Sequence, residues 1–174
     1  MARRVITPTG IECPFDDEEL IVSKTDLKGR ITYANDVFLR LAKYPAKDVI
    51  GAPHSLIRHP DMPRCIFKLL WDTIQAKKEI FAYVVNMASN GDHYWVFAHV
   101  TPTLDARQNV TGFHSSRRKP DKEQVDKIKA LYAGLRAEEE RHDSRKDGML
   151  RGHDMLMAHL KEKGVDYDEF VFAL

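Results

Sequence analysis

The 174-residue chain has little that would cross-link it or anchor it in a membrane. Its two cysteines, Cys13 and Cys65, do not form a CxxC pair, so we expect neither a disulfide framework nor a cysteine-based metal site. No apolar run approaches the roughly 18 residues of a membrane helix. No apolar stretch follows the two arginines of the opening segment, MARRVITPTG. We therefore expect a cytoplasmic protein with no direct membrane insertion.

An excess of charge of one sign is also missing. The 27 Lys and Arg residues nearly cancel the 26 Asp and Glu residues, which leaves a formal charge of +1. Proteins that bind nucleic acids usually carry a basic excess, because neutralising phosphates supplies much of their affinity. This balance argues against a nucleic-acid partner. Phosphate-cradling glycine loops, HExxH and Gly-x-Ser-x-Gly are missing too, so we expect no enzymatic activity.

The chain does contain a clear succession of periodicities. Two short β-branched runs, around residues 20–23 and 30–33, flank a turn and predict a hairpin. Helical spacing follows, then an irregular proline-rich stretch, then a helix that we expect Asp61 to cap. Period-two segments at 80–87, 93–102 and 110–116 predict three more strands. Helices confined to one stretch of an antiparallel pattern predict an α+β fold, with five strands and short helices on one face.

The composition changes after residue 120. We divide the chain into an N-terminal cap (1–18), a compact domain (19–118), an amphipathic and charged helix (119–146) and a C-terminal helical tail (147–174). The apolar stripe of the charged helix either packs on its own sheet or forms a coiled-coil homodimer or a partner contact. The last eight residues are apolar enough that we expect them to dock on the core or on a partner.

The segment 53–63, PHSLIRHPDMP, is the most informative part of the sequence. Its three prolines restrict the backbone, and an arginine, two histidines and an aspartate lie between them. A restrained loop with converging polar groups suits an anionic or amphipathic ligand. The alternative is a capped helix beside a salt-bridged loop. A zinc site is disfavoured, because no cysteine lies near the two histidines.

Several motifs together resemble the PAS domain of the Aer family of aerotaxis receptors over about residues 18–118. In chain order they read TDLKGRITYAND, IGAPHSLIRHPDMPR, LLWDTI, VVNMASNGDHYWV and TPTLDARQNVTGFHSSRR. The resemblance implies a five-stranded antiparallel sheet with short helices enclosing a cleft. It also implies non-covalently bound FAD and reporting of redox state or oxygen to the chemotaxis machinery.

The resemblance also implies which residues contact the FAD. Carried over by motif, they are Asn35, His54, Arg58, His59, Asp61, Trp71 and Asn86. The chain departs from the family just before the third long strand, where the family often has a tryptophan and this sequence reads Ile80-Phe81. Either Phe81 takes the place of that tryptophan through a small register shift, or the wall beside the flavin is aliphatic.

These inferences predict a cytoplasmic PAS sensor of redox state or oxygen, of the kind used in energy taxis. Because the membrane and methyl-accepting regions of Aer receptors are missing from this sequence, we expect it to signal in trans. The partner would be a methyl-accepting chemotaxis-type receptor or another signalling protein. Two alternatives remain at this point: a haem-binding PAS sensor with a histidine ligand, and an apo-PAS interaction or dimerisation module.

Overall fold

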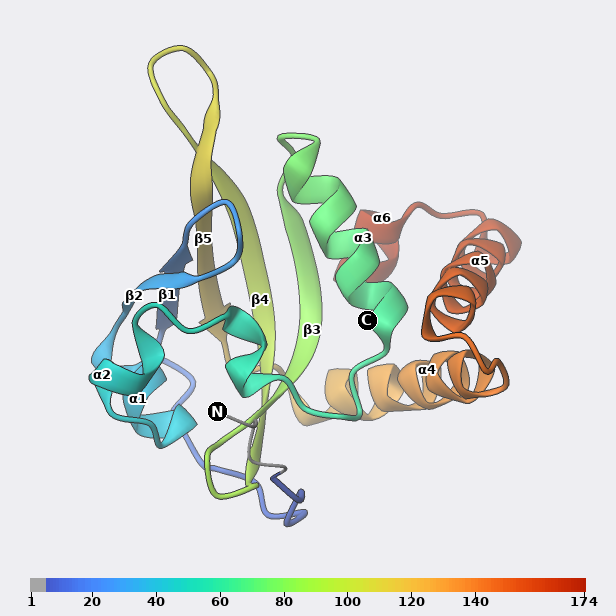
Figure 1. Cartoon of the computed structure of the whole chain (residues 1–174). Coiled ribbons are helices and arrows are strands. Elements are labelled where there is room, and N and C mark those ends of the chain that lie inside the picture. Colours follow the sequence, from blue (N-terminus) through green and yellow to red (C-terminus); the bar gives the residue numbers. More distant parts are fainter. Residues whose placement is uncertain (1–5) are drawn as a thin grey trace.

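The computed structural model describes residues 6–174, which form one five-stranded antiparallel sheet with helices on both of its faces (Figure 1). In space the strands follow the order β2-β1-β5-β4-β3. The strands are β1 (Ile21–Thr25), β2 (Ile31–Ala34), β3 (Ile80–Met87), β4 (His93–Leu104) and β5 (Val110–Arg118). The helices are α1 (Asp36–Ala42), α2 (Ala46–Val49), the short 3₁₀ helix η1 (His54–Ile57), α3 (Arg64–Gln75), α4 (Lys122–Glu140), α5 (Arg145–Lys163) and α6 (Tyr167–Phe172). The α+β fold predicted from the periodicities is confirmed.

The start of α3 differs from the sequence-based expectation. The helix begins at Arg64, and Pro63 occupies the N-cap position. A residue that precedes proline is disfavoured in helical conformation, so Met62 cannot easily join the helix and Asp61 cannot cap it. The Asp61 carboxylate instead accepts a hydrogen bond of 2.8 Å from Arg136 of α4. The predicted cap at Asp61 is therefore wrong.

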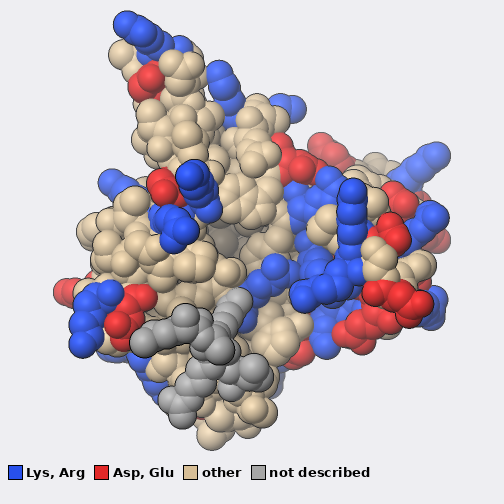
Figure 2. Space-filling model, in the orientation of Figure 1, with Lys and Arg blue, Asp and Glu red and all other residues tan. Residues whose placement is uncertain are grey.

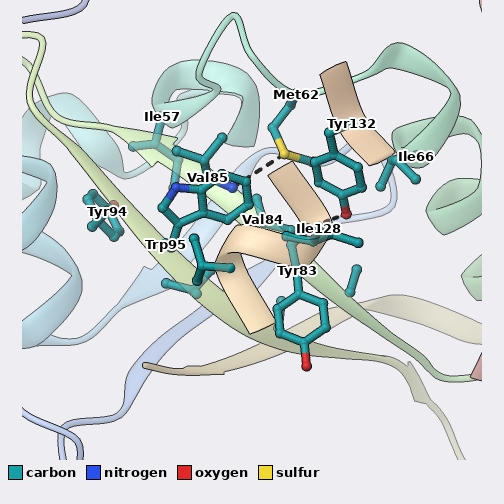
Figure 3. Close-up of a cluster of buried hydrophobic side chains, with 14 of the residues drawn as sticks. Ile57, Met62, Ile66, Tyr83, Val84, Val85, Tyr94, Trp95, Ile128 and Tyr132 are labelled. Atoms are coloured by element: carbon teal, nitrogen blue, oxygen red, sulfur yellow. Dashed lines mark hydrogen bonds between the residues drawn. The ribbon is translucent and has the colours of Figure 1, made fainter. Parts of the chain in front are cut away.

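The period-two pattern of β3 separates the two faces of the sheet. Val84 and Asn86 lie on the inner face, towards η1 and α3. Tyr83 and Val85 lie on the outer face and at the edge, among the buried side chains of Figure 3. There the Tyr132 hydroxyl donates to the Tyr83 carbonyl at 2.6 Å, and the Val85 N–H donates to the Met62 sulfur at 3.3 Å. The edge strand of the sheet is thus covered by the chain's own side chains.

The C-terminal helices pack on the rest of the same chain. The apolar stripe of α4 is buried, with Ile128 and Leu135 at most 2% exposed. Helix α5 contacts α3 and α4, and α6 contacts β3. Phe172 of α6 lies edge-on to Phe81 of β3, with 4.8 Å between the ring centroids. The apolar stripe therefore packs on the chain's own sheet, the first of the two expected arrangements.

Over residues 6–174, every helix falls short of the length or the apolar character needed to cross a bilayer.

Candidate functional site

A cavity of about 580 Å³ lies between the inner face of the sheet and the helices η1 and α3. That volume is within the range of cofactor and small-molecule sites. Strands β1, β3, β4 and β5 supply its floor, η1 and α3 supply its walls, and Met149 of α5 reaches it from the C-terminal region. Side chains from seven separate elements therefore converge on one space.

Four of the predicted site residues line this cavity: His54, Arg58, Trp71 and Asn86. The backbone of Arg58 pairs with that of Asn86 in an antiparallel β-bridge, which holds the loop after η1 beside β3. The guanidinium of Arg58 lies over the Phe67 ring of α3, with 4.1 Å to the centroid. The loop, the strand and the helix are thus fixed against one another at the cavity wall.

Asn86 is 4% exposed, and its side-chain Nδ2 is buried with no hydrogen-bond partner in the described chain. A buried donor without a partner costs about 1–3 kcal/mol, so such groups are uncommon in folded proteins. Since Asn86 lines the cavity, a bound molecule with an acceptor would satisfy this donor. Asn86 thus lies in the cavity wall, and its contact with a ligand stays a prediction.

A buried cation, Arg117 of β5, forms the centre of the polar cluster in the cavity. Its Nη2 donates to the hydroxyl of Ser23 and to Nε2 of His54, the latter at 2.7 Å. Its Nη1 is buried and has no partner in the described residues. Burial lowers the pKa of Arg117 to about 10, so the side chain stays charged at neutral pH. A buried guanidinium whose hydrogen-bond partners, Ser23 and His54, are both neutral favours an anionic or acceptor-rich ligand.

His54 is held in its neutral form by the same cluster. Burial, followed by the positive charge of Arg117, lowers its pKa to about 3 from the ordinary 6.5. Its Nε2 accepts from Arg117, so the proton of the neutral ring lies on Nδ1. His54 also lies edge-on to Phe38 of α1, at 6.2 Å between ring centroids. It therefore orients the guanidinium and does not carry charge itself.

The cavity is strongly basic. Its lining includes five cationic residues and one acidic residue: Lys28, Arg58, Arg64, Lys68 and Arg117, with Asp72. Asp72 is already paired with Lys68. In Figure 2 basic side chains gather beside the hollow in the middle of the face shown, between the sheet and the C-terminal helices. This arrangement suits a ligand that carries phosphate groups.

Trp71 closes one wall of the cavity. A Cβ added at Gly29 would lie 3.1 Å from the indole ring, and Gly29 has a positive φ of 74°. On its other side the indole meets Phe113 edge-on, at 5.4 Å between centroids. Phe81 points away from the cavity and stacks on His99 at 4.1 Å. A register shift that would bring Phe81 into the place of the family's tryptophan does not occur.

The other three predicted residues lie elsewhere. His59 and Asp61 line a second, smaller cavity of about 340 Å³, beside Trp95 and Tyr132 on the opposite side of β3. The Asp61 N–H donates to Nδ1 of His59 at 3.0 Å. Asn35 caps α1: its Oδ1 accepts from the N–H of Phe38, and its Nδ2 donates to the Leu20 carbonyl. The larger cavity therefore does not bring these three residues together with the other four.

Sequence reasoning missed Arg117 and its neighbour Ser115. The signal was present in the strand periodicity, because Phe113, Ser115 and Arg117 alternate on β5 and all three line the cavity. Ser115 pairs with Ser23 across the β1–β5 ladder, which places a small polar row on the cavity floor. Period two applied to residues 113–117 would have placed this arginine on the inner face.

Comparison with known proteins gives matches in both sequence and fold. The sequence profile of the PAS domain matches residues 18–118. The aerotaxis receptor of Escherichia coli K12 is 36% identical over 124 residues, which is 71% of this chain and 24% of that receptor. The nitrogen fixation regulatory protein of Klebsiella pneumoniae is 25% identical over 59% of this chain and 21% of its own length. The chain thus spans about a quarter or less of these relatives.

Solved structures agree with this fold. A light-oxygen-voltage domain studied with a flavin analogue superimposes with a TM-score of 0.58, over 71% of this chain and 90% of that one, at 17% identity. The light-state structure of the blue-light photoreceptor Aureochrome1 LOV gives 0.55, over 67% of this chain and 91% of that one, at 19% identity. At these identities the likeness concerns the fold alone.

Proposed function

The chain belongs to the PAS domain family, with a PAS domain of the aerotaxis-receptor type, and on that premise we propose that it is a cytoplasmic sensor that binds FAD and signals redox state or oxygen. The observation that carries the proposal is a pair of buried donors in one basic cavity, Asn86 Nδ2 and Arg117 Nη1, that have no partner within residues 6–174. Each donor requires an acceptor that residues 6–174 do not supply. The cavity has the size and charge for a phosphate-bearing cofactor.

The side chains that line the cavity are of the chemical types that FAD requires. A flavin ring has an edge of alternating donors and acceptors, which the amide of Asn86 matches. Arg117 would supply a fixed positive charge in the same cavity, and Trp71 would supply an aromatic wall. Arg58 would offer a cation for the two phosphates, together with Arg64 and Lys68, which also pair with Glu139 and Asp72. The flavin, when bound, supplies the redox chemistry, and the chain's residues bind it, orient it and set the charge around it.

The haem alternative receives less support from the cavity. The haem ligand would be a histidine from the loop or from a strand, and the cavity lining holds one of each, His54 and His114. A histidine ligand must present a free ring nitrogen to the iron, and His54 presents Nε2 to Arg117 instead. A guanidinium at that point would also repel the metal. The apo-PAS alternative leaves the two buried donors without an explanation. We therefore place FAD first, and the signalling partner would be a methyl-accepting chemotaxis-type receptor or another signalling protein that acts in trans.

The decisive experiment is the visible absorption of the purified full chain. Oxidised flavin gives two broad bands in the near ultraviolet and blue, whereas haem gives a sharp Soret band. The released chromophore is identified by chromatography against FAD and FMN standards. A colourless protein that also fails to take up added FAD would overturn the proposal.

A further inference from the structure

Helix α3, one wall of the cavity, begins without a cap from its own flanking residues. Pro63 at its N-cap provides no side-chain hydrogen bond. Instead, the carboxylate of Glu139 at the end of α4 accepts from the first two backbone N–H groups. The Arg64 N–H donates to Oε2 at 2.9 Å and the Cys65 N–H to Oε1 at 2.7 Å. Glu139 is 2% exposed, so a carboxylate from 75 residues further along the chain forms a buried cap.

Charge explains why this glutamate lies where it does. The C-terminal end of a helix carries partial negative charge, so the end of α4 is unfavourable for a carboxylate, whereas the N-terminus of α3 is favourable. Arg64 adds to the attraction: its Nε lies 3.6 Å from Oε2 of Glu139, and its Nη2 donates to the Glu139 carbonyl at 3.2 Å. Glu139 is thus stabilised by α3 and not by its own helix.

Helix α5 packs closely against the same glutamate through two glycines, Gly148 at its backbone and Gly152 at its side chain. A Cβ at Gly148 would lie 2.2 Å from the Glu139 carbonyl oxygen, and one at Gly152 would lie 2.8 Å from Glu139 Cγ. Any larger residue at either position would displace Glu139 or the backbone of α4. The N-terminus of α3, the end of α4 and the first half of α5 therefore meet at one contact.

This contact is adjacent to the cavity. The α3 residues Arg64, Phe67, Lys68 and Trp71 line the cavity, and Met149 lies between the two glycines of α5 and lines it too. We propose that Glu139 is a positioning residue for the cavity, which sets where the N-terminal half of α3 lies and so couples the ligand to α4 and α5. Because coupling is reciprocal, a ligand that orders α3 also tightens the contact of α4 and α5. The identity of the ligand rests on the proposed function, whereas the contact itself does not.

The test compares two perturbations of the contact with two matched controls. Glu139→Gln removes the charge, whereas Gly152→Ala keeps the charge and displaces the side chain that carries it. Glu140→Gln changes the neighbouring glutamate, which pairs with Arg136, and Gly134→Ala adds a methyl that meets only Met155 Cε, at 3.7 Å. For each full-length variant we would measure amide hydrogen exchange over residues 64–71 without ligand, and the dissociation constant for added FAD.

We expect both perturbations to speed exchange throughout residues 64–71 and to weaken FAD binding by about tenfold or more, while both controls match the wild type. Faster exchange with an unchanged dissociation constant would overturn the proposal, as would equal effects in the controls. If the wild type binds no FAD, the proposed function fails alone. The exchange comparison then decides the positioning role: faster exchange reaching Trp71 supports it, and unchanged exchange overturns it.

Discussion

At the scale of single residues, Asn86 and Arg117 share an arrangement that folding alone does not require. Each is almost fully buried, each has a donor without a partner in the part of the chain that the structure describes, and both line the same cavity. A residue kept for the stability of the ligand-free protein would normally have its donors satisfied. We therefore expect these two donors to form hydrogen bonds, and so to contribute free energy, only when a ligand is bound.

Replacing Asn86 tests this directly. Asn86→Ala should leave the free energy of unfolding of the ligand-free protein within about 1 kcal/mol of wild type, because the donor that it removes is unpaired. The same change should raise the dissociation constant for FAD about 10- to 100-fold. Asn109→Ala, in the turn between β4 and β5, is the matched control. Equal loss of stability with and without FAD, at unchanged affinity, would instead make Asn86 a structural residue.

His54 should make the stability of the protein depend on pH. Its pKa in the folded chain is about 3, below the ordinary 6.5, so between these values the unfolded chain binds a proton that the folded chain does not. The stability is therefore fully present above pH 6.5 and decreases as the pH falls towards 3, by at most about 1.4 kcal/mol per pH unit from this group. Urea unfolding from pH 7 to 4.5 measures the slope.

His54→Gln should flatten that slope. The burial of His59 also lowers its pKa, so part of the dependence should remain in the variant. His153→Gln on α5 is the comparison variant. If His54→Gln and wild type gave identical slopes, the buried neutral state assigned to His54 would be wrong.

At the scale of elements, α6 is a short helix with a large share in the packing. Phe170 and Val171 are at most 8% exposed, and Phe172 covers the aromatic side chains of β3 and β4. Ending the chain after Lys163 removes both of these buried side chains. The loss of their hydrophobic burial should lower the free energy of unfolding by about 3–6 kcal/mol. Phe172→Ala, at a side chain that is 60% exposed, should cost much less. A truncated chain with the wild-type midpoint in urea would contradict this role.

The strands were predictable from the sequence because their signals are local. The period-two run of β3 matched its observed bounds, and the turn at Gly91 set the partner strand. The long-range contacts were not predictable in this way. Glu139 belongs to a run of charged residues that predicts a solvated helix, and only the position of α3 in space makes it a buried cap. Likewise, the sequence placed His54 and His59 in one site, whereas the turn after η1 sends them to opposite sides of β3.

At the scale of the whole molecule, the C-terminal helices and the PAS domain share one core. Buried residues of α4, α5 and α6 belong to the same hydrophobic cluster as those of the sheet. We expect a single cooperative unfolding transition. Far-ultraviolet circular dichroism mainly follows the helices, and tryptophan emission follows Trp71 and Trp95 on the two sides of β3. Their urea midpoints should coincide, and separate midpoints would show that the helices form an independent unit.

The cover over the edge of β3 also has a consequence for biosynthesis. The residues that complete it, Tyr132 of α4 and the aromatic end of α6, are made after the strand that they protect. At ribosomal speeds of about 5–20 residues per second, roughly 4–17 s separate the synthesis of Met87 from that of Leu174. During that interval the nascent chain would expose an apolar strand edge, which is a template for pairing between chains. The chain is therefore expected to need a holding chaperone most in the interval between the translation of β3 and that of α6.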